Sequence, residues 1–136
     1  MTDENKTTDE VKNVDPAKVE EVSAQVVMPK ISIDDLHKVE ISVGEIKTAE
    51  KVENADRLLR LTVDFGGEVR QIVSGIAEYF TPEYLIGKKC PFVTNLQPRM
   101  IKGLESSGMI LAAKDDEGNF SLLDVDSKIK AGTKLS

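Results

Sequence analysis

The chain has 136 residues, the size of one domain, with 31% charged residues, 40% hydrophobic residues and a net charge of −6 at pH 7. This balance is typical of a globular protein and argues against a generic nucleic-acid binder, which would be basic overall. No apolar run is long enough to cross a membrane, the N-terminus lacks the features of a signal peptide, and the single cysteine, Cys90, cannot form an internal disulfide. We therefore expect a cytoplasmic protein with no membrane segment.

Residues 1–30 read as an acidic, largely disordered tail, with seven carboxylates against four lysines. Within it, Asp15 and Pro16 suit an N-cap and the first position of a helix. Three valines, the last of them Val26, then recur at spacings of three and four. The pattern predicts a short amphipathic helix over 16–27, which either docks on the domain or a partner, or is marginal by itself.

Residues 31–136 read as one folded domain that opens with a helical turn from Ile33 to His37. Apolar residues alternate with polar ones up to Val43, and after Gly44 this alternation shifts by one position. The shift predicts a β-bulge at Gly44 in the first strand. Gly66-Gly67 predicts a tight hairpin, and Thr81-Pro82 starts a short helix that ends at Gly87. Strands are expected over 39–46, 59–65, 69–73, 90–96, 109–113 and 120–123. About five main strands with one interposed helix predict an all-β fold, namely the small, closed, five-stranded barrel called the OB-fold.

Charge is distributed unevenly along this domain. Residues 84–104 hold four basic residues, Lys88, Lys89, Arg99 and Lys102, and no acidic one. Residues 115–126 hold five acidic residues and no basic one. One face is then positive and another negative, although two ordinary solvated surfaces explain the same pattern. The small residues in 74–75 and 106–108 are either simple turns or gaps through which backbone approaches a phosphate.

Two loops of the expected barrel flank one face, the loop over 53–57 and the loop before the strand at Met109. Neither loop contains an aromatic residue, and the chain has four Phe, two Tyr and no Trp. The binding groups in these loops are therefore charged side chains, hydroxyl groups and the backbone. Such groups suit recognition of a folded RNA by its shape and phosphate positions rather than by base stacking.

Catalytic and metal-binding patterns are not found. His37 is the sole histidine, and no zinc-ligand spacing, Walker loop or G-x-G-x-x-G is present. We expect no catalytic residue, no metal and no cofactor.

Two stretches of the chain resemble the halves of the tRNA-binding domain family: AEKVENADRLLRLTVDFGG with VRQIVSGI, and LIGKKCPFVTNLQPRMIKGLESSGMILAA. The opening ISIDDLHKVEISVGEI is similar to the version in methionyl-tRNA synthetase. The resemblance covers residues 31–136. It implies an OB-fold that binds the outside of the tRNA L-shape without strong sequence preference, and a homodimer closed by N- and C-terminal extensions.

Carried over residue by residue, the resemblance implies twelve tRNA-binding positions. These are Asn54, Asp56, Arg57, Arg70, Ser74, Gly75, Asn95, Arg99, Lys102, Ser106, Gly108 and Met109. The chain departs from the family pattern in three places. It has Val52-Glu53 where the family often has His-Pro, it keeps only two charges in the loop from Arg99 to Gly103, and Cys90-Pro91 interrupts a usually Val-rich strand. The last departure predicts an edge strand or a strand that starts late.

The leading hypothesis is a non-catalytic tRNA-binding module that assists methionyl-tRNA synthetase or acts as its beta subunit. An initial Met and a separate tail favour a freestanding polypeptide, with the valine stripe as a docking site for the catalytic subunit. The alternative is a CsaA-type chaperone, which shares the fold but not the K-G-x-x-S-x-G-M pattern ending at Met109. A complete synthetase is excluded by length, although a methionine–tRNA ligase name can attach through association with the enzyme.

Overall fold

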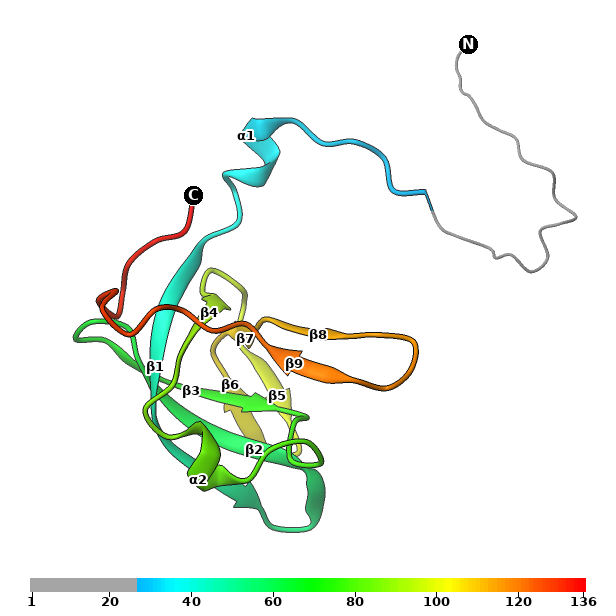
Figure 1. The fold of residues 1–136 in the computed structure, drawn as a ribbon, viewed down its shortest axis with the longest axis vertical. Helices are drawn as coiled ribbons and strands as arrows, with labels where there is room; N and C mark the ends of the chain where they lie inside the picture. The colour runs from blue at the N-terminus through cyan, green and yellow to red at the C-terminus, as the bar shows by residue number, and fades with distance from the viewer. Residues whose placement is uncertain (1–26) are drawn as a thin grey trace, which may run out of the picture. The chain divides into compact units, whose positions relative to one another are not determined.

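A computed structural model describes residues 27–136 (Figure 1). Within it, Ile33–Ser136 belong to one compact unit. The helix predicted over 16–27 falls almost entirely in residues 1–26, which lie outside the described residues. In the described part of the chain, no helix is both long and apolar enough to span a membrane.

The main sheet has five antiparallel strands in the order β3-β2-β1-β4-β7. The strands are β1 (Ile41–Val52), β2 (Ala55–Asp64), β3 (Val69–Ser74), β4 (Lys89–Val93) and β7 (Met109–Ile110). The long strand β1 pairs with β4 through its N-terminal half and with β2 through its C-terminal half. The sheet therefore curls around β1 (Figure 1). This order, with a short helix between β3 and β4, confirms the predicted OB-type, all-β architecture.

The two outer strands, β3 and β7, are not paired with each other. Individual hydrogen bonds instead join β3 to Ser106 and Ser107, which precede β7 in the chain. Ser107 N donates to Gln71 O at 2.9 Å, and Val73 N donates to Ser106 Oγ at 3.0 Å. The barrel is therefore partly open, not fully closed as the strand pattern suggested.

The bend of β1 comes from a bulge at Lys47, not at Gly44 as predicted. Ile46 pairs with Val63 and Thr48 with Thr62, so Lys47 is the extra residue. Gly44 sits in regular pairing with Cys90. Its role is close packing, since a Cβ there would lie 2.5 Å from Val63 Cγ1 and 2.9 Å from Phe92 Cδ1.

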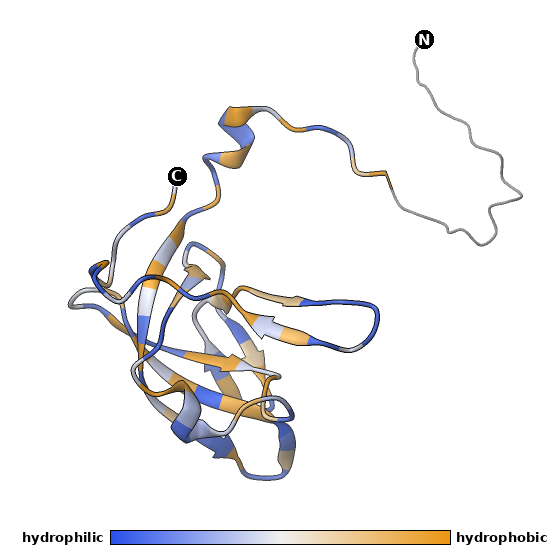
Figure 2. Ribbon diagram, in the orientation of Figure 1, coloured by the Kyte–Doolittle hydropathy of each residue, from blue (hydrophilic) through white to orange (hydrophobic). Residues whose placement is uncertain are grey.

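The core lies inside the curled sheet, between β1, β2, β3 and β4. Hydrophobic and hydrophilic residues alternate along these strands (Figure 2), as expected for strands with one buried face. Phe92 is fully buried and meets Phe65 edge-on, with ring centroids 5.5 Å apart. The other fully or almost fully buried members include Ile46, Leu59, Leu61, Val63, Ile72, Leu85 and Cys90.

Two short helices form where expected. The first, α1 (Ile33–Leu36), has no buried residue. The second, α2 (Pro82–Leu85), is capped by Thr81, whose side chain accepts a hydrogen bond from Tyr84 N, and it buries Leu85. Gly87 follows with a φ of 90°, a conformation that favours glycine.

The stretch predicted as a loop from Arg99 to Ser106 is in fact a hairpin of β5 (Arg99–Ile101) and β6 (Leu104–Ser106). The single strand predicted over 109–113 is also wrong. It divides into β7, which pairs with β4, and β8 (Ala112–Lys114), which is not part of the main sheet. Strand β8 pairs with β9 (Phe120–Leu122) in a second hairpin.

Pro91 lies inside the sheet, which contradicts the prediction of an edge or late-starting strand. Strand β4 begins at Lys89 and lies between β1 and β7. Pro91 is opposite Val43, whose N–H and C=O pair with Thr133 and Gly132 of the C-terminal segment instead. A residue without an N–H is therefore tolerated at this position.

Candidate nucleic-acid interface

Two hairpin tips lie side by side at one end of the barrel. The β1–β2 hairpin turns at Glu53-Asn54, and the residues over 56–58 then bulge from β2, because Val52 pairs with Ala55 and Lys51 with Leu59. The β5–β6 hairpin turns at Lys102-Gly103. Asn54 (φ 63°) and Lys102 (φ 50°) are the non-glycine residues with positive φ in the described chain. Such conformations gather at functional sites more often than elsewhere.

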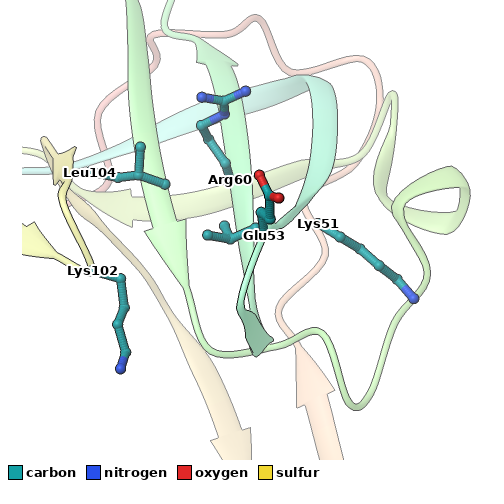
Figure 3. A pocket seen from close by; sticks show the side chains of 6 residues that line it. Lys51, Glu53, Arg60, Lys102 and Leu104 are labelled. Atoms are coloured by element: carbon teal, nitrogen blue, oxygen red, sulfur yellow. The ribbon is translucent and has the colours of Figure 1, made fainter.

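Lys102 separates two surface hollows between these tips. One hollow, of about 400 Å³, is lined by Lys51, Val52, Glu53, Arg60, Lys102 and Leu104. In Figure 3, Lys51 and Lys102 extend from opposite sides of it, with Arg60 and Glu53 between them. The other, of about 430 Å³, is lined by residues 54–58, Ile101 and Lys102. An extended anionic chain can therefore pass on either side of the Lys102 side chain.

Three cations of these two hairpins are uncommitted. Within residues 27–136, Lys51, Arg99 and Lys102 are all exposed and no carboxylate lies within ion-pair distance of them. Arg57 pairs with Glu78 at 2.7 Å, but most of its side chain is exposed. We call the surface formed by Lys51, Asn54, Arg57, Arg99 and Lys102 the hairpin surface.

The structure brings together five of the twelve predicted site residues. Asn54, Asp56, Arg57 and Lys102 line one hollow, and Arg99 begins the same hairpin that carries Lys102. Ser74 is half-buried where β3 ends, and Gly75 beside it is exposed, with Arg57 O 3.9 Å from the position of a Cβ. These two residues adjoin the hairpin surface through Arg57.

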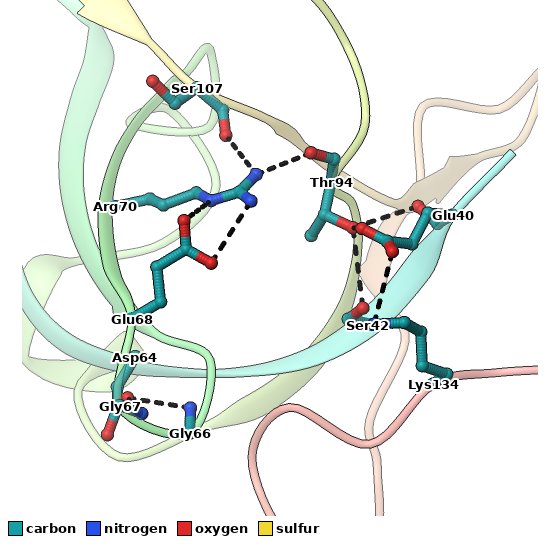
Figure 4. A network of polar contacts seen from close by, with 10 residues as sticks. All are labelled: Glu40, Ser42, Asp64, Gly66, Gly67, Glu68, Arg70, Thr94, Ser107 and Lys134. Atoms are coloured by element: carbon teal, nitrogen blue, oxygen red, sulfur yellow. Dashed lines mark hydrogen bonds and ion pairs between the residues drawn. The ribbon is translucent and has the colours of Figure 1, made fainter.

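Arg70, Asn95 and Ser106 instead serve the fold. The Arg70 guanidinium pairs with Glu68 and donates to Thr94 O at 2.6 Å and to Ser107 O at 3.3 Å (Figure 4). The Asn95 amide group accepts from Glu40 N and donates to Lys38 O. Ser106 is 1% exposed. Its hydroxyl accepts from Val73 N and donates to Gly108 O. We therefore omit these three side chains from the hairpin surface.

Gly108 and Met109 belong neither to the hairpin surface nor to the residues whose hydrogen bonds serve the fold. Gly108 is buried with a φ of 151°, and a Cβ there would lie 3.1 Å from Val93 O and 3.2 Å from Ile72 Cδ1. This close approach explains a glycine without any ligand. Met109 is the first residue of β7 and is 42% exposed, so its side chain is open to a ligand.

The network around Arg70 ties the two ends of the domain together. Thr94 Oγ1 donates to the Glu40 carboxylate at 2.6 Å, and Lys134 pairs with that carboxylate at 3.2 Å (Figure 4). The Thr94 hydroxyl and then Lys134 lower the pKa of Glu40. Since Lys134 belongs to the C-terminal segment, this contact holds that segment beside the start of β1.

Sequence reasoning missed Lys51 and Arg60. Both belong to strands, where the sequence does not distinguish a single charged residue from an ordinary solvent-exposed position. Only the pairing register reveals that Lys51 lies next to the hairpin tip, opposite Leu59. Val52 and Glu53, where the chain departs from the family pattern, line the hollow beside Lys51.

The side chains around the two hollows include groups that bind anions. The described residues contain no group of three or more His, Cys, Asp or Glu side chains that could hold a metal ion. Burial raises the pKa of the Cys90 thiol to about 11, so Cys90 is a packing residue and not a nucleophile. Lysine, arginine and small polar groups around open hollows can bind a polyanion.

Comparisons with known proteins identify relatives of this chain. Among curated proteins, the methionine–tRNA ligase of Methanocaldococcus jannaschii is 51% identical over 118 residues, which are 87% of this chain and 18% of that protein. The enzyme of Caldanaerobacter subterraneus is 52% identical over 106 residues, 78% of this chain and 16% of that protein. The chain thus spans less than a fifth of the length of these relatives.

Solved structures show the same fold. A methionyl-tRNA synthetase-related protein from Pyrococcus horikoshii has a TM-score of 0.77 and 39% identity, and the match covers 80% of this chain and all of that one. The chaperone CsaA from Bacillus anthracis has a TM-score of 0.71 and 27% identity, covering 79% of this chain and all of that one. The family model described as a putative tRNA binding domain matches residues 41–134. The chain therefore belongs to the tRNA-binding domain family.

Proposed function

We propose that this protein is a non-catalytic module that binds tRNA through the hairpin surface, by shape and phosphate contacts and without strong sequence specificity. The observation that carries the proposal is the convergence of uncommitted cations from two hairpins onto adjoining hollows. Lys51 comes from β1 and Lys102 from the β5–β6 turn, and both line one hollow. Membership of the tRNA-binding domain family supports tRNA as the polyanion.

The charges of the hairpin surface set the expected strength of binding. If Lys51, Arg57, Arg99 and Lys102 each neutralise one phosphate, the slope of log K against log salt is roughly −3 to −4 per subunit. Each subunit then binds weakly at physiological salt, and a second subunit or a protein partner supplies avidity.

The proposal is tested by filter binding of tRNA to the Lys51→Ala/Lys102→Ala variant. A matched control is Lys128→Ala/Lys130→Ala, which removes two exposed lysines of the C-terminal segment and gives the same net charge. We expect the first variant to lose affinity and the control to retain it. Equal losses in the two variants would mean that net charge, and not the hairpin surface, governs binding.

The proposed setting is the cytoplasm, in a homodimer that assists methionyl-tRNA synthetase as an auxiliary or beta subunit. Synthetase relatives that carry a matching segment support the association. Ile33 and Leu36 of α1 and Leu135 of the C-terminal segment are exposed apolar side chains that suit a subunit interface. Analytical ultracentrifugation tests the dimer, since Ile33→Glu/Leu36→Glu should then sediment as a monomer. An unchanged dimer would place the interface elsewhere.

A CsaA-type chaperone activity is the second candidate, favoured by the similarity to the CsaA structure. The two functions separate in one pair of assays. Suppression of the aggregation of a denatured client without measurable tRNA binding would favour the chaperone, whereas tRNA binding without suppression would favour the module.

A further inference from the structure

A cluster of aromatic side chains lies outside the hairpin surface. Four of the six aromatic residues of the chain contact one another: Tyr79, Phe80, Tyr84 and Phe120. They come from the loop before α2, from α2 itself and from β9. We call these four residues the aromatic surface. Both tyrosines of the chain belong to it.

The aromatic surface has two phenylalanines packed against the core and two exposed tyrosines stacked on them. Phe80 and Phe120 are half-buried and pack against the core. Tyr79 stacks on Phe120 with centroids 4.2 Å apart and planes 8° apart, and Tyr84 is parallel to Phe80 at 5.2 Å. Tyr79 is 38% exposed and Tyr84 54% exposed. A shallow hollow of about 120 Å³ lies among Phe80, Tyr84 and Phe120. The tyrosine rings are therefore held in position by their stacking partners and remain partly exposed.

Each tyrosine has a lysine ammonium group over its ring, so a base that stacks on that face must move the lysine side chain aside. Lys88 Nζ lies 4.5 Å from the centroid of Tyr84, and Lys114 Nζ lies 5.9 Å from that of Tyr79. An aromatic ring beside an ammonium group suits a ligand in which a flat base is joined to a phosphate, such as a nucleotide.

Several carboxylates also lie nearby, and some are already engaged. Glu78 pairs with Arg57, and Asp124 pairs with Lys88 at 3.5 Å. Asp115 accepts hydrogen bonds from Asn119 and from backbone N–H groups of its own turn. The remaining local acids limit how many phosphates can approach. Such a surface fits one or two nucleotides bound mainly by stacking, not a long phosphate track.

The aromatic surface is joined to the hairpin surface by a short, well-bonded loop. Ala77 N donates to Arg57 O at 3.1 Å, and the Glu78 carboxylate meets Arg57 Nε at 2.7 Å. Tyr79, the next residue, stacks on Phe120. One RNA molecule held at Arg57 can therefore extend an unpaired segment to the tyrosines.

We propose that the aromatic surface is a second RNA contact, which stacks the bases of one or two unpaired nucleotides. The inference rests on the proposed function and adds a single-stranded element to the RNA that this module recognises. The ammonium groups beside both tyrosines favour a nucleotide over an apolar peptide.

Tyrosine emission gives a direct readout, because the chain has no Trp and both of its tyrosines lie here. The full chain is titrated with a single-stranded oligouridylate of about ten nucleotides and, separately, with a duplex RNA of the same length. We expect saturable quenching by the single strand and much less by the duplex.

Variants then separate stacking from charge, with binding followed by the anisotropy of a labelled oligouridylate. Tyr79→Leu/Tyr84→Leu should weaken single-strand binding about five-fold or more, while Tyr79→Phe/Tyr84→Phe should retain it. The Phe variant keeps both rings and so tests the idea even if the Leu variant folds poorly. Arg99→Ala/Lys102→Ala should lower tRNA affinity but leave most of the tyrosine quenching, which distinguishes failure of this inference from failure of the proposed function.

Three results would overturn the inference. One is equal oligouridylate affinity for the wild type and a folded Leu variant. Another is emission that changes with protein concentration alone, since the surface would then join two copies of the chain. The third is quenching by a proline-rich peptide and not by RNA, which would identify a peptide partner instead.

Discussion

Replacing Lys102 by Asn separates the fold of the β5–β6 hairpin from its charge. Lys102 and Gly103 both have positive φ, 50° and 83°, as in a type I′ turn. The left-handed conformation costs an ordinary residue roughly 1–2 kcal/mol, and asparagine tolerates it better. We therefore expect Lys102→Asn to stabilise the domain by about 0.5–1 kcal/mol, which raises Tm by about 2–8 °C for a domain of this size.

The same substitution should weaken tRNA binding. Loss of one phosphate contact reduces the steepness of log K against log salt by about 0.7–0.9. If affinities converge near 1 M salt, this corresponds to a roughly four- to six-fold loss of affinity at 0.15 M salt. Thermal unfolding followed by circular dichroism gives the first quantity, and filter binding of tRNA across salt concentrations gives the second. A variant that is no more stable and binds tRNA with an unchanged salt slope would refute both the turn assignment and the role of Lys102.

Three further predictions concern the fold. Gly44→Ala places a Cβ within 3.0 Å of three core side chains, so urea unfolding should show a loss of stability of about 1–3 kcal/mol. Gly75→Ala should change stability little, because its Cβ would meet only Arg57 O, at a van der Waals distance of 3.9 Å. An aromatic disulfide reagent at pH 8 should label Cys90 only after unfolding, because the thiol is buried and its pKa is raised to about 11; fast labelling of the native protein would contradict this. Hydrogen bonds from Asn119 hold the pKa of Asp115 below its usual 3.8, so its stabilisation is complete above that pH and is lost as pH falls through the lowered pKa. Asp115→Asn should remove this part of the acid dependence in unfolding titrations, and an unchanged dependence would argue against it.

Local signals in the sequence predicted the elements that depend on local chemistry. The hairpin at Gly66-Gly67 and the Thr81-capped helix both form as expected. Each is determined by residues within a few positions of one another, because glycine supplies positive φ and Thr, Asp or Asn supplies short-range hydrogen bonds.

Features that depend on distant pairing could not be predicted in this way. The bulge at Lys47 follows from the register of β1 against β2. The alternation of apolar and polar residues around Gly44 does not reveal that register. The β5–β6 hairpin has three-residue strands and a Lys-Gly turn, a weaker signal than Asn-Gly. Ser106 resembles a phosphate ligand in sequence, yet its hydroxyl accepts a hydrogen bond from Val73 N across the open edge of the barrel. Arg70 likewise meets partners on two other segments.

The most direct test of the central claim is the salt dependence of tRNA binding to the wild type and to Arg99→Ala/Lys102→Ala. Both residues are exposed, and neither makes an ion pair within residues 27–136, so their removal should leave the fold intact. We predict a wild-type log–log slope of roughly −3 to −4 per subunit and a double-variant slope about two smaller in magnitude, with lower affinity at 0.15 M salt. Equal affinity and equal slopes for the two proteins would contradict the assignment of tRNA binding to the hairpin surface.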